Sequence, residues 1–195
     1  LQRALQIKKE SLGVVEAMSA EQIGQFPDSD IGQAVARLPG VTVNRGSLNY
    51  ASAAGAPTAT GAVQGINVDG FGGSFNEVLI EGRQIASGNG QTFNFGDFSP
   101  TYVGEIDVMK TPDFSLSSGN IASTTNIKFP NPFDNPGLHI TGFYQEDLNS
   151  NAGQGTPNFG AMWSDTSSDG KFGLLLDGDY LNDQFKNQHQ DIVGW

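Results

Sequence analysis

The sequence predicts a small α+β domain, built from short mixed strands with two short helices, followed by antiparallel strands of the transmembrane β-barrel type. Residues 1–130 alternate short β-branched runs with capped helical turns and glycine-rich loops, whereas the runs after Pro132 are longer and alternate apolar with polar side chains. With 26 glycines and 37% hydrophobic residues among 195, the composition also favours strands, turns and loops over a helical bundle. We therefore expect two domains, at residues 1–130 and 131–195.

The composition disfavours several classes of protein. Twenty-one acidic residues against ten basic ones give a net charge of −11, which disfavours nucleic acid as a partner. The absence of cysteine excludes disulfides, thiolate metal sites and a cysteine nucleophile. No apolar run approaches the roughly 18 residues of a membrane helix. The start has no basic segment followed by an apolar one, so we expect any secretory signal to have been removed.

Two short helices are predicted by capping pairs, in which a Ser or Asp side chain can accept a hydrogen bond from the backbone three residues further on. The pairs are Ser19 with Gln22, and Asp30 with Gln33. The first pair predicts a helix over residues 19–25. The second predicts a helix that Pro39 ends and whose apolar residues share one face.

Short apolar or β-branched runs predict the strands of the first domain. They cover residues 12–16, 41–43, 77–81, 102–110 and 125–129. Residues 46–62 are almost all small or polar and cannot bury enough apolar surface to order themselves, so we expect a mobile loop there.

The second domain contains three longer runs, at residues 138–147, 158–165 and 171–182. In the third run Leu174, Leu176 and Tyr180 share one face, and Asp177 and Asp179 share the other. A transmembrane β-strand needs about 9–11 residues with apolar side chains on one face and polar side chains on the other. The alternation therefore predicts barrel strands, with a soluble β-meander as the alternative.

Five short motifs follow one another in a fixed order along the chain. They are Arg37-Leu38-Pro39-Gly40-Val41, Val78-Leu79-Ile80-Glu81-Gly82-Arg83, Ile106-Asp107-Val108-Met109-Lys110-Thr111-Pro112, Asn126-Ile127 and Pro132-Phe133-Asp134. In this order they resemble the plug domain of TonB-dependent outer-membrane receptors. The segment from Gly70 to Gly137 is most similar to the proteobacterial branch often tied to carbohydrate uptake. The similarity implies a plug at residues 1–130, then a linker and the first three strands of an incomplete β-barrel.

The resemblance implies an energy-coupled uptake receptor in the bacterial outer membrane rather than an enzyme. The plug gates the barrel lumen, helps to bind an extracellular ligand (an oligosaccharide in this branch), and rearranges when a TonB-type periplasmic energy-coupling protein pulls on it. Three strands cannot close a barrel, because their open edges would leave unpaired backbone groups in the membrane. The expected partners are therefore this coupling protein, the remainder of the barrel, the outer membrane and a small extracellular ligand; no cofactor is expected.

Ligand contact in this family falls on outward-facing plug loops, and aromatic rings beside amide groups suit sugars. The candidates are Asn49, Tyr50, Phe71, Phe75, Asn76, Asn89, Gln91, Phe93 and Asn94. The alternative for Phe93, Phe95 and Phe98 is that they close the plug core. An iron chelate is the alternative ligand, although the acidic balance argues against a catechol chelate.

A plug that must leave its barrel needs a surface of reversible charge pairs, and several charged residues can supply them. The candidates for plug–barrel contact are Arg37, Arg45, Arg83, Lys110, Glu77, Glu81, Glu105 and Asp107. The alternative is that each is a solvated charge at a strand edge.

Catalytic and metal sites are not expected. His139 and His189 lie fifty residues apart, without the spacing of metal ligands. Asp177 and Asp179 resemble an acid pair, but alternating carboxylates are also typical of a lumen wall. A secreted or surface β-rich binding module is the alternative from another functional class. Extraction that requires detergent would favour the receptor over this module.

Overall fold

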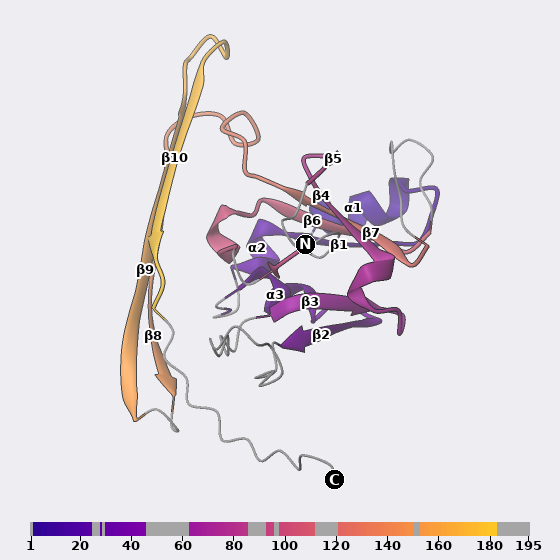
Figure 1. The fold of residues 1–195 in the computed structure, drawn as a ribbon. Helices are drawn as coiled ribbons and strands as arrows, with labels where there is room; N and C mark the ends of the chain where they lie inside the picture. Colours follow the sequence, from indigo (N-terminus) through magenta and orange to yellow (C-terminus); the bar gives the residue numbers. More distant parts are fainter. Residues whose placement is uncertain are drawn as a thin grey trace.

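The computed structural model describes residues 2–24, 28, 30–45, 63–85, 93–95, 98–111, 121–149 and 153–182. They form a compact α+β unit and, beside it, an upright three-stranded antiparallel sheet (Figure 1). The predicted fold class, an α+β plug-type unit followed by antiparallel strands, is confirmed.

A five-stranded mixed sheet forms the centre of the α+β unit. Its strands are β1 (Val15–Ser19), β4 (Asn76–Ile80), β5 (Arg83–Gln84), β6 (Glu105–Met109) and β7 (Ser123–Lys128). Their spatial order is β1-β6-β7-β4-β5, with β4 and β7 parallel and the other neighbours antiparallel. Every residue of β6 is buried, because this strand is inside the sheet and covered on both faces.

A second, smaller layer packs on this sheet. It contains the hairpin of β2 (Val41–Arg45) and β3 (Val63–Val68), helices α2 (Ala20–Ile23) and α3 (Ile31–Val35), and the 3-10 turns η1 (Gly73–Phe75) and η3 (Pro100–Tyr102). The apolar core lies between the layers, with Ile31, Ile66, Phe95, Ile106 and Ile127 almost completely buried. Phe95 thus fills the core role considered for it from the sequence.

Several boundaries differ from the sequence-based prediction. Strand β1 begins at Val15 instead of Leu12, and Ser19 is its last residue as well as the start of α2. In the capping pair only one bond forms, in which the Ser19 backbone N–H donates to Gln22 Oε1 at 3.2 Å. Helix α1 (Gln2–Glu10) and strand β3 were not predicted. Helix α1 contributes one buried residue, Ala4, to the fold.

The Asp30 cap supports a stability prediction. Asp30 is buried, and its Oδ1 accepts a hydrogen bond from the Gln33 backbone N–H at 2.9 Å, as the sequence pattern predicted. Asp30→Ala should lower the free energy of unfolding of the α+β unit by about 1 kcal/mol, because the partly buried Gln33 N–H loses its side-chain acceptor. Native-state hydrogen exchange of α3 in the full-length protein would measure the loss. Asp30→Asn keeps an acceptor and should retain most of the protection; equal losses for both variants would contradict this account.

The upright sheet consists of β8 (His139–Asn149), β9 (Gln154–Thr166) and β10 (Gly173–Tyr180), in the order β10-β9-β8. A short turn at residues 167–172 joins β9 to β10, with the Ser167 backbone N–H donating to the Phe172 carbonyl at 2.8 Å. Among the described residues, no helix is long and apolar enough to cross a membrane.

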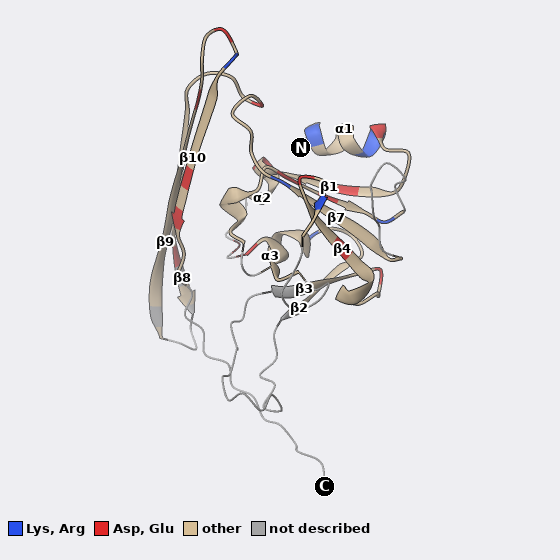
Figure 2. Cartoon of the chain, turned by 45° about the horizontal axis from the view of Figure 1, so that its top comes forward, with Lys and Arg blue, Asp and Glu red and all other residues tan. Residues whose placement is uncertain are grey.

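The two faces of this sheet differ in polarity. On the outer face, directed away from the α+β unit, the side chains are largely apolar: Ile140, Tyr144, Leu148, Phe159, Trp163, Leu174, Leu176 and Tyr180. The inner face is mainly polar and includes Gln145, Thr156, Asn158, Ser164, Thr166, Asp177 and Asp179. Figure 2 shows acidic positions along β10. This arrangement agrees with the alternation expected of barrel strands.

Candidate functional site

The two ends of the molecule can be distinguished by the strand connections. The arrowhead end of β8 and the β2–β3 hairpin lie toward one end of the molecule in both ribbon views (Figures 1 and 2). Helix α1 and the turn from β9 to β10 lie toward the opposite end.

A cavity of about 440 Å³ lies between the β2–β3 hairpin, η1, β4 and the segment around Phe93. Its lining includes Asn44, Asn67, Ser74, Phe93 and Asn94. None of the described lining residues carries a charge, so the cavity offers amide and hydroxyl groups beside an aromatic ring. Such a lining can hold an uncharged polar group by hydrogen bonds and ring contact.

Phe93 is placed by two neighbouring aromatic rings. Its centroid lies 4.8 Å from Phe95 in an edge-to-face contact and 5.1 Å from Phe98 in a stacked contact. Phe95 is buried in the core, whereas Phe93 remains half-buried and lines the cavity. The contacts with Phe95 and Phe98 therefore orient the Phe93 ring that lines the cavity.

The other candidate ligand residues divide into three groups. Asn76 is buried, and its Nδ2 donates to the carbonyls of Ile66, Phe71 and Gly72 at 3.0–3.2 Å, so its amide nitrogen is used within the fold. Phe71 and Phe75 are half-exposed and form an edge-to-face pair with centroids 6.2 Å apart, outside the cavity lining. Asn49, Tyr50, Asn89 and Gln91 lie outside the described residues.

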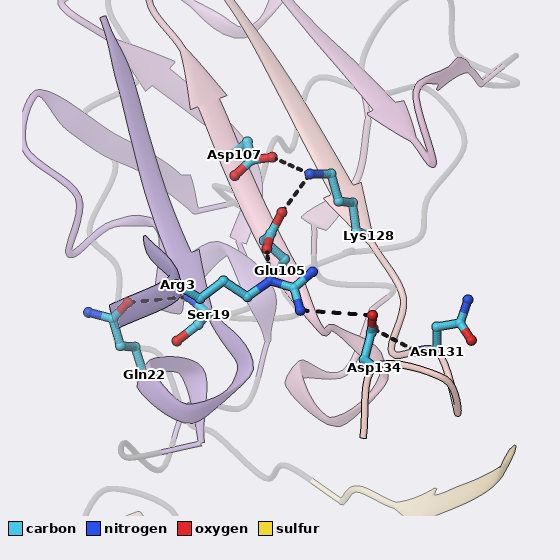
Figure 3. A network of polar contacts seen from close by, with 8 residues as sticks. All are labelled: Arg3, Ser19, Gln22, Glu105, Asp107, Lys128, Asn131 and Asp134. Atoms are coloured by element: carbon cyan, nitrogen blue, oxygen red, sulfur yellow. Dashed lines mark hydrogen bonds and ion pairs between the residues drawn. The ribbon is translucent and has the colours of Figure 1, made fainter. Parts of the chain in front are cut away.

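A network of charged side chains joins α1, β6, β7 and the segment that leads to β8 (Figure 3). Glu105 accepts from Arg3 Nε at 2.6 Å and from Lys128 Nζ at 2.5 Å. Lys128 Nζ also lies 2.8 Å from Asp107 Oδ2, and Arg3 Nη1 lies 3.9 Å from Asp134 Oδ1. The Glu105 and Asp107 side chains are almost fully buried, so these pairs form in a largely water-excluded environment.

Burial and pairing shift the pKa values in this network in different directions. Burial raises the pKa of the Asp107 carboxyl, and Lys128 only partly offsets that effect. Burial also disfavours charge on Glu105, but Lys128 and Arg3 outweigh it and leave the pKa of Glu105 below its ordinary value. The pKa of Lys128 is raised, because its two carboxylate partners outweigh burial. Asp107 Oδ1 is buried without a hydrogen-bond partner among the described residues.

The charged residues expected at a plug–barrel interface form bonds inside the α+β unit where their partners are described. Lys110 Nζ donates to the Pro39 carbonyl at 2.8 Å and to Asp69 Oδ1 at 3.0 Å. A Cβ at Gly40 would collide with both Lys110 Nζ and Asp69 Oδ1, and Gly40 also has φ of +72°, so only glycine fits there.

The remaining expected contact residues have varied surroundings. Arg37 pairs with Asp28, Glu81 accepts from the Phe129 backbone N–H at 2.6 Å, Glu77 is buried, Arg83 is exposed, and Arg45 is the last residue of β2. Their contact with a complete barrel stays a prediction.

A contact between the α+β unit and the upright sheet was not predicted. Tyr102 in η3 faces Asp179 on the inner face of β10, and its interaction with this carboxylate is the main cause of the raised pKa of the Tyr102 hydroxyl. Beside it, a cavity of about 410 Å³ is lined by Phe98, Tyr102, Phe129, Pro130, Leu175 and Asp177. The sequence signal was the inward alternation of Asp177 and Asp179, which did not identify the tyrosine opposite.

Comparison with solved structures finds the same fold in several receptors. The siderophore receptor PirA from Acinetobacter baumannii aligns with a TM-score of 0.63 and 23% identity over 90% of this chain. The ferric citrate transporter FecA aligns with a TM-score of 0.66 and 17% identity, also over 90% of this chain. The ferric enterobactin receptor PfeA from Pseudomonas aeruginosa aligns with a TM-score of 0.57 and 19% identity over 85%. The chain spans about a quarter of these structures (25%, 26% and 24%).

Comparison with curated protein sequences gives no significant match. The family model described as "TonB-dependent Receptor Plug Domain", by contrast, matches residues 7–124, more than half of the chain. Proteins of this family are outer-membrane proteins of Gram-negative bacteria, which confirms the predicted location. Matched over residues 7–124 and supported by the shared fold, the chain belongs to the TonB-dependent receptor plug domain family.

Proposed function

We propose that this chain is the plug and the first barrel strands of an outer-membrane receptor that takes up a small extracellular ligand. Residues 1–130 close the lumen, and β8, β9 and β10 begin the wall around it. A TonB-type periplasmic protein supplies the energy by pulling on the plug. Residues 131–138 link the two domains, and the remaining wall strands lie outside the 195 residues.

The polarity of the upright sheet is the observation that supports this proposal most strongly. Its outer face presents large apolar side chains, with Ile140 70% and Leu176 58% exposed, which is costly in water and favourable in lipid. Its inner face presents carboxylates and hydroxyls to the plug, and Asp179 faces Tyr102. A secreted binding module would have no reason to keep this apolar face uncovered.

The ligand that we propose is a ferric chelate. Its support is the fold shared with receptors described as binding siderophores, ferric enterobactin or ferric citrate. These similarities favour the chelate over the oligosaccharide that the sequence resemblance implied. An oligosaccharide remains the second candidate because the cavity at Phe93 is lined by amides and carries no charge among its described lining residues.

A direct binding measurement would separate the two ligand classes. The full-length receptor, purified in detergent, would be titrated with ferric enterobactin, ferric citrate and maltoheptaose while its tryptophan fluorescence is recorded. We expect one ferric chelate to bind at least tenfold more tightly than maltoheptaose. Tight binding of maltoheptaose alone would favour the second candidate, and no binding of either chelate would reject the first.

The cavity makes a specific prediction for the same titration. Phe93→Ala and Asn94→Ala should each weaken ligand binding about tenfold, because each removes a ring contact or a hydrogen bond from the cavity lining. The matched control is Phe133→Ala, which removes an exposed ring from the linker at the opposite end. If Phe133→Ala weakens binding as much as Phe93→Ala, the cavity is not the binding site.

A further inference from the structure

Helix α1 has very little apolar contact with the rest of the plug. Ala4 is its only buried residue, while Leu5 on the same helix is 59% exposed. An isolated helix of nine residues is unstable in water, so tertiary contacts must hold α1 in place. Because Ala4 is buried and Ile7 only half-buried, polar contacts must supply part of this stabilisation.

Two ion pairs, one near each end of α1, provide these contacts. Arg3 Nε donates to Glu105 Oε2 on β6 at 2.6 Å, and Lys8 pairs with Glu16 on β1. Figure 2 shows basic positions, coloured blue, near both ends of the helix. The two pairs differ in environment: the Glu105 side chain is 4% exposed, whereas Glu16 is 17% exposed. The Arg3 side chain is itself 58% exposed and that of Lys8 38%, but a charge-assisted hydrogen bond to an almost fully buried carboxylate is the stronger kind, so we expect the Arg3 pair to contribute more.

Glu105 keeps a second cation if Arg3 is removed. Lys128 on β7 bonds the other carboxylate oxygen at 2.5 Å, so the buried charge would remain compensated (Figure 3). Arg3 also faces Asp134 in the linker, but at 3.9 Å between two exposed side chains this pair contributes little. Arg3 therefore stabilises the position of α1 strongly and that of the linker weakly, and it contributes almost nothing to the stability of the central sheet.

We propose that Arg3 is a positioning residue whose charge docks helix α1 onto the plug, so that α1 separates from β6 without opening the β6–β7 sheet. In a receptor whose N-terminus is pulled, α1 would then detach first, at a load set by the Arg3–Glu105 pair. This consequence for coupling rests on the proposed function. The docking of α1 by Arg3 does not.

Hydrogen exchange of the full-length receptor in detergent, without any ligand, tests the proposal. Arg3→Gln should raise the exchange rates of the α1 amides at residues 6–11 about tenfold, and those of β6 and β7 less than twofold. Arg3→Lys keeps the charge and should restore most of the protection. Asp134→Asn should change the exchange rates of the α1 amides about twofold or less. Lys9→Gln is the matched control, because it removes the same charge from an exposed position on α1. Its α1 exchange rates should stay within twofold of those of the unmodified receptor.

Three results would overturn the proposal. The α1 exchange rates could stay unchanged in Arg3→Gln, or the exchange rates of β6 and β7 could rise as much as those of α1. The third is a loss of α1 protection in Arg3→Lys as large as in Arg3→Gln. If a variant fails to assemble, the salt dependence of exchange in the unmodified receptor tests the proposal independently. Because charges hold the helix, raising NaCl from 50 to 500 mM should increase α1 exchange severalfold while β6 and β7 stay constant. Salt-independent exchange would contradict docking by charge. None of these outcomes depends on which ligand the receptor takes up.

Discussion

Replacing Lys128 with glutamine should lower the free energy of opening of β6 and β7 by about 2–3 kcal/mol at neutral pH. Lys128 is the cation that bonds both Glu105 and Asp107, whose side chains are 4% and 9% exposed. Without it, Glu105 retains Arg3, but Asp107 becomes a buried carboxylate without a cation. We place the loss below that of a fully buried pair because the Lys128 side chain is itself 38% exposed. Native-state hydrogen exchange of the full-length receptor would measure it.

The loss in Lys128→Gln should shrink as the pH falls. Burial already raises the pKa of Asp107 above its ordinary value, and removal of Lys128 raises it further. A carboxyl whose pKa is higher in the folded state binds protons more readily when folded, so its cost is relieved below that pKa and returns as the pH rises through it. The difference between variant and unmodified receptor should therefore be smaller at pH 5 than at pH 7.5, after correction for intrinsic exchange rates.

The matched control for this substitution is Lys171→Gln. Lys171 lies 3.9 Å from Asp169 in the exposed turn between β9 and β10, so we expect no measurable change. A Lys128→Gln loss that stays constant with pH, or that is no larger than that of Lys171→Gln, would show that the buried carboxylates do not depend on Lys128.

The parts of the fold that the sequence predicted are those with a local signal. The helix cap at Asp30 depends on residues three apart, and the strand at β6 depends on alternation within one run. The polarity of the upright sheet was likewise readable, because neighbouring residues on a strand point to opposite faces. These patterns need no knowledge of distant contacts.

The features that the sequence did not predict depend on residues far apart in the chain. Helix α1 has one buried residue, and its docking partner Glu105 is 102 residues away from Arg3. The Tyr102–Asp179 contact likewise joins two separate units. Glu105 and Asp107 were identified as candidate charges from sequence, but their partners Arg3 and Lys128 follow only from strand order. The alternation of residues along a strand predicts on which face of the sheet a charged side chain lies. The order of the strands determines which residue it pairs with.

Leu176→Arg should destabilise the assembled receptor by about 2–4 kcal/mol, provided that β10 crosses the membrane. Leu176 is the fourth of eight residues in β10 and lies on the outer face opposite Trp163, so its replacement would place a charge in the lipid near the middle of the strand. Urea-induced unfolding of the full-length receptor in lipid vesicles, followed by tryptophan fluorescence, would measure the change. Retention of full stability would mean that this face does not contact lipid.

Thr141→Arg is the matched control, because it places the same charge on the opposite face at a nearby depth. Thr141 pairs with Met162, and Met162 pairs with Asp177, the residue after Leu176, so Thr141 lies on the inner face one residue from that level. Its side chain is exposed, and an arginine there would meet the polar side chains that surround the plug. We expect a loss below about 1 kcal/mol. Equal losses at the two positions would mean that the sheet has no lipid side and lumen side, and the assignment of β8, β9 and β10 to a barrel wall would fail.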